Sequence, residues 1–214
     1  KLADAPYDTS NMRFNDGRCD AAGRFWAGAM FEPRTAERAG VCCLERGMIR
    51  HGWGPEEQLG VKVSNGMAFT TDNRHVFQSD TPNHVIYQFD FEIQTGAIGA
   101  RREFARRPDN RTDAGYAGRP DGAAVDSTGN YWSAQYEGRC VLRFSPQGEV
   151  TGIVHVPAKR VTMVAFGGPA LRTLYITTAR EGASETELLT DVHAGGIFAC
   201  ELDVAGRAEP MYLD

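Results

Sequence analysis

The sequence predicts an all-β protein of the β-propeller class. Short β-branched and aromatic runs alternate with clusters of Gly, Asp and Asn, and long amphipathic helices are lacking. An aromatic residue recurs at one place in four successive repeats: Trp26, Phe77, Trp132 and Tyr175. Four strands in a repeat of about fifty residues are what a propeller blade requires, whereas a β-sandwich gives no reason for such a period.

Each recurring aromatic residue lies on the second strand of its predicted blade. A third strand follows in each repeat, at residues 41–44, 85–88, 141–144 and 197–200. The first strands are expected to start at Gly17, Gly66, Gly122 and Met163. A turn then leads to a fourth, more polar strand, and the four turns carry Gly47, Gly96, Gly148 and Gly206. The polar stretches 105–118 and 179–195 are predicted to be surface loops, the second with one helical turn around Glu185–Leu189.

The composition limits the classes of partner. A net charge of −5 over 214 residues argues against nucleic acid, which requires a basic face. No apolar run approaches the roughly 20 residues that span a bilayer, so no membrane association is predicted. Five cysteines without a C-x-x-C pair fit neither a disulfide framework nor a zinc site. They are interpreted as buried thiols in a reducing compartment, which predicts a cytoplasmic protein.

The repeats also superpose four polar residues just before the expected first strands: Asp16, Asn65, Asp121 and Thr162. Residues that are equivalent by rotation face one another around a propeller axis. Carboxylate and amide oxygens converging there would suit a hard divalent cation. The alternative is that Asn-Asp-Gly, Ser-Asn-Gly and Pro-Asp-Gly serve only as turns. Spacing by itself leaves both interpretations open.

The chain resembles the SMP-30/gluconolactonase/regucalcin family in several motifs. They are Met12-Arg13-Phe14-Asn15-Asp16-Gly17, Asp20-Ala21-Ala22-Gly23-Arg24-Phe25-Trp26-Ala27-Gly28, Ser64-Asn65-Gly66, Arg119-Pro120-Asp121-Gly122, Phe166-Gly167-Gly168 and Gly195-Gly196-Ile197-Phe198. The resemblance implies a six-bladed propeller with one divalent metal ion in its central channel. It also implies the hydrolysis of sugar lactones to aldonic acids.

The resemblance assigns roles to particular residues. Asn65 and Asp121 would be metal ligands, with Asp121 also the catalytic carboxylate, and Arg13 and Asn15 would face the substrate. An ungapped match puts Pro33 where the family often has a substrate-facing Glu, so the neighbouring Glu32 is the candidate for that role. Nothing in residues 1–12 matches the family's glutamate metal ligand in the first blade. The expectation is therefore a single propeller domain over residues 1–214 that lacks its first two blades.

The function that the resemblance implies is that of a metal-dependent lactonase. A lactone is an activated ester, so Asp121 could deprotonate a water while Arg13 offsets the negative charge of the transition state. The alternatives are a non-catalytic calcium-binding or scaffold propeller, which would not need Arg13, and a hydrolase of other esters or phosphotriesters. Oxygen ligands favour Ca²⁺, Mg²⁺ or Mn²⁺, with Zn²⁺ and Fe²⁺ left open. The expected partner is a small sugar lactone, and the oligomeric state is left open.

Overall fold

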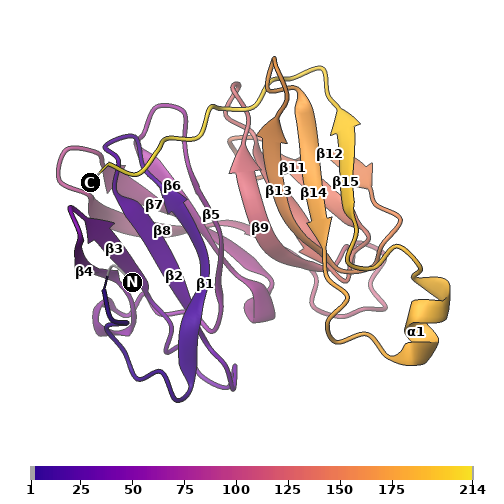
Figure 1. The fold of residues 1–214 in the computed structure, drawn as a ribbon, viewed down its shortest axis with the longest axis horizontal. Helices are drawn as coiled ribbons and strands as arrows, with labels where there is room; N and C mark the ends of the chain where they lie inside the picture. Colours follow the sequence, from indigo (N-terminus) through magenta and orange to yellow (C-terminus); the bar gives the residue numbers. More distant parts are fainter. Residues whose placement is uncertain (1–2, 214) are drawn as a thin grey trace. The chain divides into compact units, whose positions relative to one another are not determined.

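The computed structural model describes residues 3–213 and confirms the β-propeller class. The chain forms two compact units: in Figure 1 the first is indigo to magenta together with the yellow C-terminal end, and the second runs from rose to yellow. Unit 1 contains the chain up to Phe104 and again from Glu209, and unit 2 contains Ala105–Ala208. Among the residues described, no helix is long and apolar enough to cross a membrane.

Unit 1 contains two four-stranded antiparallel blades. The first has the order β1 (Met12–Cys19), β2 (Phe25–Phe31), β3 (Val41–Glu45) and β4 (Met48–Trp53). The second has the order β5 (Ser64–Phe69), β6 (His75–Asp80), β7 (Val85–Glu92) and β8 (Ala97–Arg106), whose last residues pass into unit 2. Two short 3-10 helices interrupt the connections, η1 (Pro55–Glu57) and η2 (Thr81–Asn83).

Unit 2 contains one four-stranded and one three-stranded antiparallel blade. The four-stranded blade consists of β9 (Arg119–Val125), β10 (Tyr131–Tyr136), β11 (Cys140–Phe144) and β12 (Val150–His155). The other blade consists of β13 (Val161–Gly167), β14 (Thr173–Thr178) and β15 (Ile197–Glu201). The short helix α1 (Glu185–Thr190) lies between β14 and β15, which confirms the predicted helical turn.

The recurring aromatic residues lie on the second strand of each blade, as predicted. Trp26, Phe77 and Trp132 are buried, and Phe77 packs against Phe104 with ring centroids 4.8 Å apart. Tyr175 is 43% exposed, because the face of β14 that carries it is opposite to the face that packs Leu174 and Ile176 into the core.

Two expectations about strand boundaries are wrong. The first strands begin two to five residues before the expected glycine or methionine, because pairing with the second strand continues through a β-bulge. The described residues after Gly206, 207–213, form no fourth strand. Instead, Gly206 forms an isolated bridge with Asp126, and its N–H donates to the carbonyl of Leu171.

Aromatic stacking forms the core of unit 1. Trp53 lies between Trp26 and Phe89, with ring centroids 5.5 and 5.4 Å away, and its indole N–H donates to Gln78. Large aromatic side chains bury much surface in few residues, so they dominate the packing energy between the two blades. The core of unit 2 is mainly aliphatic and packs Trp132 against residues such as Val164, Leu174 and Ile176.

Three of the five cysteines are buried thiols, as predicted, whereas Cys19 and Cys200 are only partly buried. All five are free thiols, and Cys42, Cys43 and Cys140 are buried. Burial raises the pKa of each of these three thiols to about 11. They are therefore protonated at neutral pH and act as small apolar side chains.

Buried carboxylates organise the turn between the first and second strand in one blade of each unit. Asp20 accepts hydrogen bonds from the backbone N–H groups of Ala22 and Arg24, from Arg24 Nε and from the indole of Trp26. Asp126 repeats this arrangement with Thr128, Asn130 and the indole of Trp132. Each carboxylate thus fixes both its turn and the rotamer of the core tryptophan six residues later.

The C-terminal segment Glu209–Leu213 packs on unit 1. Glu209 forms an ion pair with Arg18 at 2.7 Å, the N–H of Leu213 donates to the carbonyl of Gly23, and the hydroxyl of Tyr212 accepts from the N–H of Gly47. Gly23 must remain glycine here, because it has a φ of +82° and a Cβ would come 2.5 Å from the Leu213 side chain. The last residues are therefore part of the first blade's tertiary structure.

Asp126→Asn should destabilise the protein by about 2–4 kcal/mol at pH 7, because it weakens a buried network of charge-assisted hydrogen bonds. Burial by itself would raise the pKa of Asp126, but the bonds from Trp132, Asn130 and Thr128 outweigh it and lower that pKa. The stability difference should thus be complete above about pH 4, the unfolded pKa of Asp, and shrink as the pH falls through the folded pKa.

Urea unfolding of the two proteins between pH 3 and pH 8 measures this difference. The exposed Asp113→Asn variant is the control and should match the original protein. A stability difference that does not change with pH would contradict the role given to the Asp126 charge.

Candidate functional site

A β-bulge recurs in the first strand of every described blade, next to the polar positions that the repeats superpose. The pairing shifts between Phe14 and Gly17 in β1 and between Asn65 and Ala68 in β5. In β9 two residues, Asp121 and Gly122, lie opposite one residue of β10, and in β13 the shift falls at Thr162. A bulge redirects the local side chains. Asp16, Asp121 and Thr162 lie inside their bulges, whereas Asn65 is paired with Ser79 directly before the bulge of β5.

Glycines make these bulges possible. Gly66 has a φ of +58°, in the left-handed region that favours glycine. A Cβ on Gly122 would lie 2.7 Å from the carbonyl oxygen of Thr162 on β13, so β9 and β13 approach too closely there for a side chain. The Asx-Gly pairs are therefore required by the strand geometry, whatever else they do.

The structure brings the predicted residues Asn15 and Asn65 together in unit 1. The Asn15 amide donates from Nδ2 to the carbonyl of Ser64 at 3.0 Å, immediately before Asn65. Asn65 itself is 6% exposed, and its Nδ2 donates to Thr81 Oγ1 at 3.1 Å. The amide also carries an oxygen, and an amide oxygen is a ligand type that a hard cation prefers.

Asp16 clamps the first strands of unit 1 to each other. One carboxylate oxygen accepts from the N–H of Gly17 at 2.8 Å and the other from the N–H of Met67, on β5, at 2.9 Å. Burial raises the pKa of Asp16, although the Arg18 charge and the backbone N–H bonds act in the opposite direction. The carboxylate is thus engaged in joining β1 to β5, a role that the superposition of repeats did not suggest.

Arg13 and Glu32, both predicted to face the substrate, form an ion pair. Arg13 Nε lies 3.0 Å from Glu32 Oε1, and both side chains are about half exposed. Arg13 is on β1, and Glu32 directly follows β2, held by a hydrogen bond from its N–H to the carbonyl of Asn11. The hairpin therefore places one cation and one carboxylate side by side on the surface near Asn15.

Asp121 lies in unit 2, on the bulge of β9, and its side chain is partly exposed. Thr162, its counterpart on β13, shares a hydrogen bond with Thr177 at 2.9 Å between the hydroxyl oxygens. Asn65 belongs to unit 1 and Asp121 to unit 2, so the metal site that they would form together stays a prediction.

The polar loop between β14 and β15 is less solvated than expected. Glu187 pairs with Lys159 and with Arg160, and the buried Asp191 accepts from the N–H of Lys159 and from Arg139. The two Arg160 and Lys159 contacts lower the pKa of Glu187 to about 2. The loop is therefore held by Lys159 and Arg160, which directly precede β13, and by Arg139, which lies between β10 and β11.

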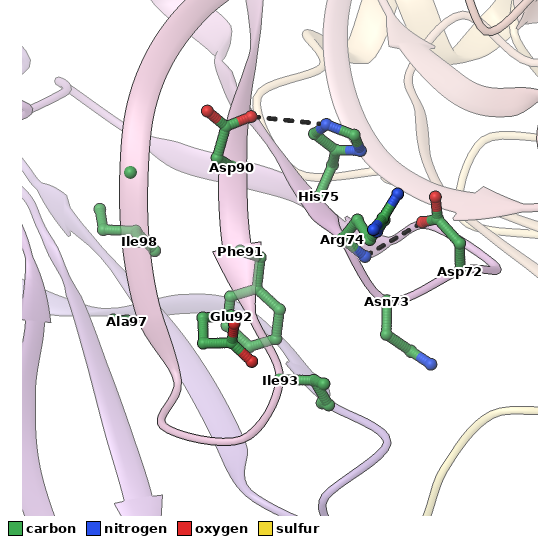
Figure 2. A pocket seen from close by; sticks show the side chains of 11 residues that line it. Asp72, Asn73, Arg74, His75, Asp90, Phe91, Glu92, Ile93, Ala97 and Ile98 are labelled. Carbon is green, nitrogen blue, oxygen red and sulfur yellow. Dashed lines mark hydrogen bonds and ion pairs between the residues drawn. The ribbon is translucent and has the colours of Figure 1, made fainter.

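Two cavities in unit 1 differ from the predicted site. Figure 2 shows one of about 650 Å³ between the β5–β6 turn and strands β7 and β8, where His75 lies 3.4 Å from Asp90. It contains no residue with a predicted role. The other, of about 330 Å³, has Asn15 and Asp16 on one side, but its remaining wall is mainly apolar, with Phe14, Phe25 and Leu44 among its residues.

One group of candidate metal ligands was not predicted. His51, Glu56 and Glu57 place potential ligand atoms within 4.8 Å of one another on the exposed surface of unit 1. His51 Nε2 already lies 3.0 Å from both carboxylate oxygens of Glu57, which also accepts from the N–H of Gly54. The capping of η1 and the ion pair explain the group without a metal ion.

The fold and the repeated bulges define a β-propeller with polar residues at the start of its inner strands. Residues 1–180 match the family described as "SMP-30/Gluconolactonase/LRE-like region". The chain belongs to this family, as its motifs suggest.

Two of the relatives are named as lactonases. The chain is 44% identical to the 6-deoxy-6-sulfogluconolactonase of Pseudomonas putida over 99% of its own length and 69% of that protein. It is 35% identical to pentonolactonase XacC of Haloferax volcanii over 98% of its length and 67% of that protein.

Solved structures give the same fold. The calcium-binding protein regucalcin of Agrobacterium tumefaciens superposes with a TM-score of 0.89 at 24% identity, over 99% of this chain and 68% of that one. The gluconolactonase XC5397 of Xanthomonas campestris gives a TM-score of 0.61 at 26% identity, over 77% of this chain and 53% of that one. The first of these similarities bears on the fold alone.

Gly122→Ala should cost about 1–3 kcal/mol of stability, because the new methyl group would press on the backbone carbonyl of Thr162. Gly152→Ala is the matched control. It also lies inside a strand, but its Cβ would meet only the Arg143 side chain at an ordinary 3.5 Å. Chemical denaturation of both variants tests the close approach of β9 and β13, which equal effects would rule out.

Proposed function

We propose that the protein is a metal-dependent hydrolase that opens sugar lactones to aldonic acids. The observation that supports the proposal is the bulge in two first strands that carry the family's motifs, with Asn65 directly before it in β5 and Asp121 inside it in β9. The relatives named as lactonases of a sulfonated gluconolactone and of pentonolactones support this substrate class.

The donor set fits a hard divalent cation. Asn65 would contribute an amide oxygen and Asp121 a carboxylate oxygen, the ligand types that Ca²⁺, Mg²⁺ and Mn²⁺ prefer, and Zn²⁺ or Fe²⁺ also accept such ligands. Polarisation of the lactone carbonyl is the chemistry that a bound ion would supply. The likeness to a protein titled calcium-binding supports only the fold and leaves the metal to experiment.

The other catalytic and binding roles are assigned to side chains of the protein. Asp121 accepts a proton from the attacking water, a contribution of typically about 10²–10⁴-fold in rate. Arg13 offsets the negative charge that develops on the lactone oxygens, while its ion pair with Glu32 fixes the direction of the guanidinium. Asn15 and Glu32 hydrogen-bond sugar hydroxyl groups, which need polar partners when they leave water.

We also propose that residues 1–214 belong to a single propeller domain. Its support is that the same bulge and the same buried turn carboxylate occur in both compact units. Such internal repetition is expected of blades in one propeller.

A panel of aldonolactones tests the reaction and the metal together. Gluconolactone, its 6-deoxy-6-sulfo analogue and a pentonolactone would be incubated with metal-stripped and metal-restored full-length protein, and acid release would be followed by pH-stat titration. We expect hydrolysis that chelation abolishes and that one of the divalent ions restores. Activity that survives chelation would contradict metal dependence, and metal binding without any hydrolysis would favour a non-catalytic propeller.

Asp121→Asn should lower kcat by about 10²–10⁴-fold while the fold remains, because the amide keeps the side-chain shape but cannot take the proton. Circular dichroism and steady-state kinetics measure the two effects. Asp113→Asn, in an exposed loop of the same unit, should keep full activity. Near-normal turnover of Asp121→Asn would remove Asp121 as the base.

A further inference from the structure

Three side chains, those of Arg119, Tyr136 and Arg160, lie in a row near the start of β9 and β13 in unit 2. The guanidinium of Arg119 lies over the ring of Tyr136, 4.9 Å from its centre, where the two residues pair across β9 and β10. The Tyr136 hydroxyl is near Gly182, whose carbonyl accepts from Arg160 Nη2 at 2.9 Å. Tyr136 therefore stands between two guanidinium groups.

Both arginines occupy the same place relative to the inner-strand positions. Arg119 precedes Asp121 by two residues, and Arg160 precedes Thr162 by two. Two residues of extended strand span about 7 Å. Because β9 and β13 touch at Gly122 and Thr162, both side chains start close to Asp121 within one compact unit.

The charges around the row do not cancel. Glu137 Oε2 lies 2.8 Å from both Arg111 and Arg119, so two cations share one carboxylate. Glu187 is likewise shared by Lys159 and Arg160. The nearby Asp191 is already paired with Arg139.

These charges are present at neutral pH. Burial by itself would lower the pKa of Arg160, but Glu187 and a hydrogen bond with Tyr136 raise it, and Glu187 has a pKa of about 2. Arg111, Arg119, Lys159 and Arg160 face three carboxylates, those of Glu137, Glu187 and Asp121, so one positive charge remains in excess, in a chain whose net charge is −5. Such a surplus attracts an anion, and guanidinium groups bind oxyanions through paired hydrogen bonds.

We propose that Arg119 and Arg160, spaced by Tyr136, bind an anionic substituent of the substrate while its lactone carbonyl lies at Asp121. The inference rests on the proposed lactonase function and deepens it by naming the substrate class. The preferred substrates are aldonolactones that carry an oxyanion group, such as a sulfonate or a phosphate, on the carbon beyond the ring. Arg119 and Arg160 are specificity residues, and the reaction itself does not use them.

The test compares kcat/KM of the full-length protein for gluconolactone, 6-deoxy-6-sulfogluconolactone and 6-phosphogluconolactone. We expect at least one anionic lactone to be preferred, and the two anionic arms distinguish sulfonate from phosphate. Arg119→Gln should lose about 10–100-fold on the preferred anionic lactone, mainly through KM, as expected for one charge-assisted contact. Its activity on neutral gluconolactone should stay within about twofold, since the reacting groups are untouched.

Arg111→Gln is the matched control, because Arg111 shares Glu137 with Arg119 but is 65% exposed. It should change neither substrate by more than about twofold. Equal losses on neutral and anionic lactones in Arg119→Gln would mean a structural role and would overturn the proposal, as would a wild-type preference for the neutral lactone.

Calorimetric binding of 6-deoxy-6-sulfogluconate, 6-phosphogluconate and gluconate separates this inference from the lactonase proposal. If no lactone is hydrolysed, tighter binding of an anionic acid that Arg119→Gln abolishes would still support the anion site. Equal binding of the three acids would refute the anion site, even in a protein that hydrolyses lactones.

Discussion

A buried carboxylate that accepts an indole N–H and its own turn's backbone N–H groups is the interaction on which one blade in each unit depends. Asp20 and Asp126 have almost no contact with water, so every oxygen lone pair has to be used within the protein. In satisfying them, the chain orders the first hairpin and orients Trp26 or Trp132 into the core. The first strand of the blade carries the bulge and ends at this turn. The turn therefore also holds the strand on which the candidate site residues lie.

The region around the bulge of each first strand differs in role from the turn that joins the first strand to the second. In the former region the backbone bulges, glycines allow strands to approach closely, and polar side chains replace apolar ones. Some of these groups maintain the structure, as Asp16 does by joining β1 to β5. Others, such as the Arg13–Glu32 pair, remain about half exposed. Polar groups that maintain the fold can thus be distinguished from polar groups that the fold does not require. The functional proposals rest on the second kind.

Much of the fold could be predicted from sequence because blade strands are local. Each hairpin joins neighbouring segments, so the period of the aromatic residues and the turn glycines were sufficient to identify second and third strands. The first strands were predicted to start too late. Asn65 and Asp121 stand before glycines in turn-like sequences, but the structure continues the strand pairing on both sides of them through a bulge. The absent fourth strand after Gly206 and the clamp made by Asp16 depend on contacts between distant segments, which spacing does not encode.

The docking of Glu209–Leu213 on the first blade has a consequence for the order of events during synthesis. Residues 105–208 are translated between the two parts of unit 1, so the ribosome must complete all of unit 2 before Tyr212 and Leu213 can reach Gly47 and Gly23. Domains commonly begin to fold from the N-terminus as they emerge. The blade formed by β1–β4 is therefore completed only after all of unit 2 has been synthesised.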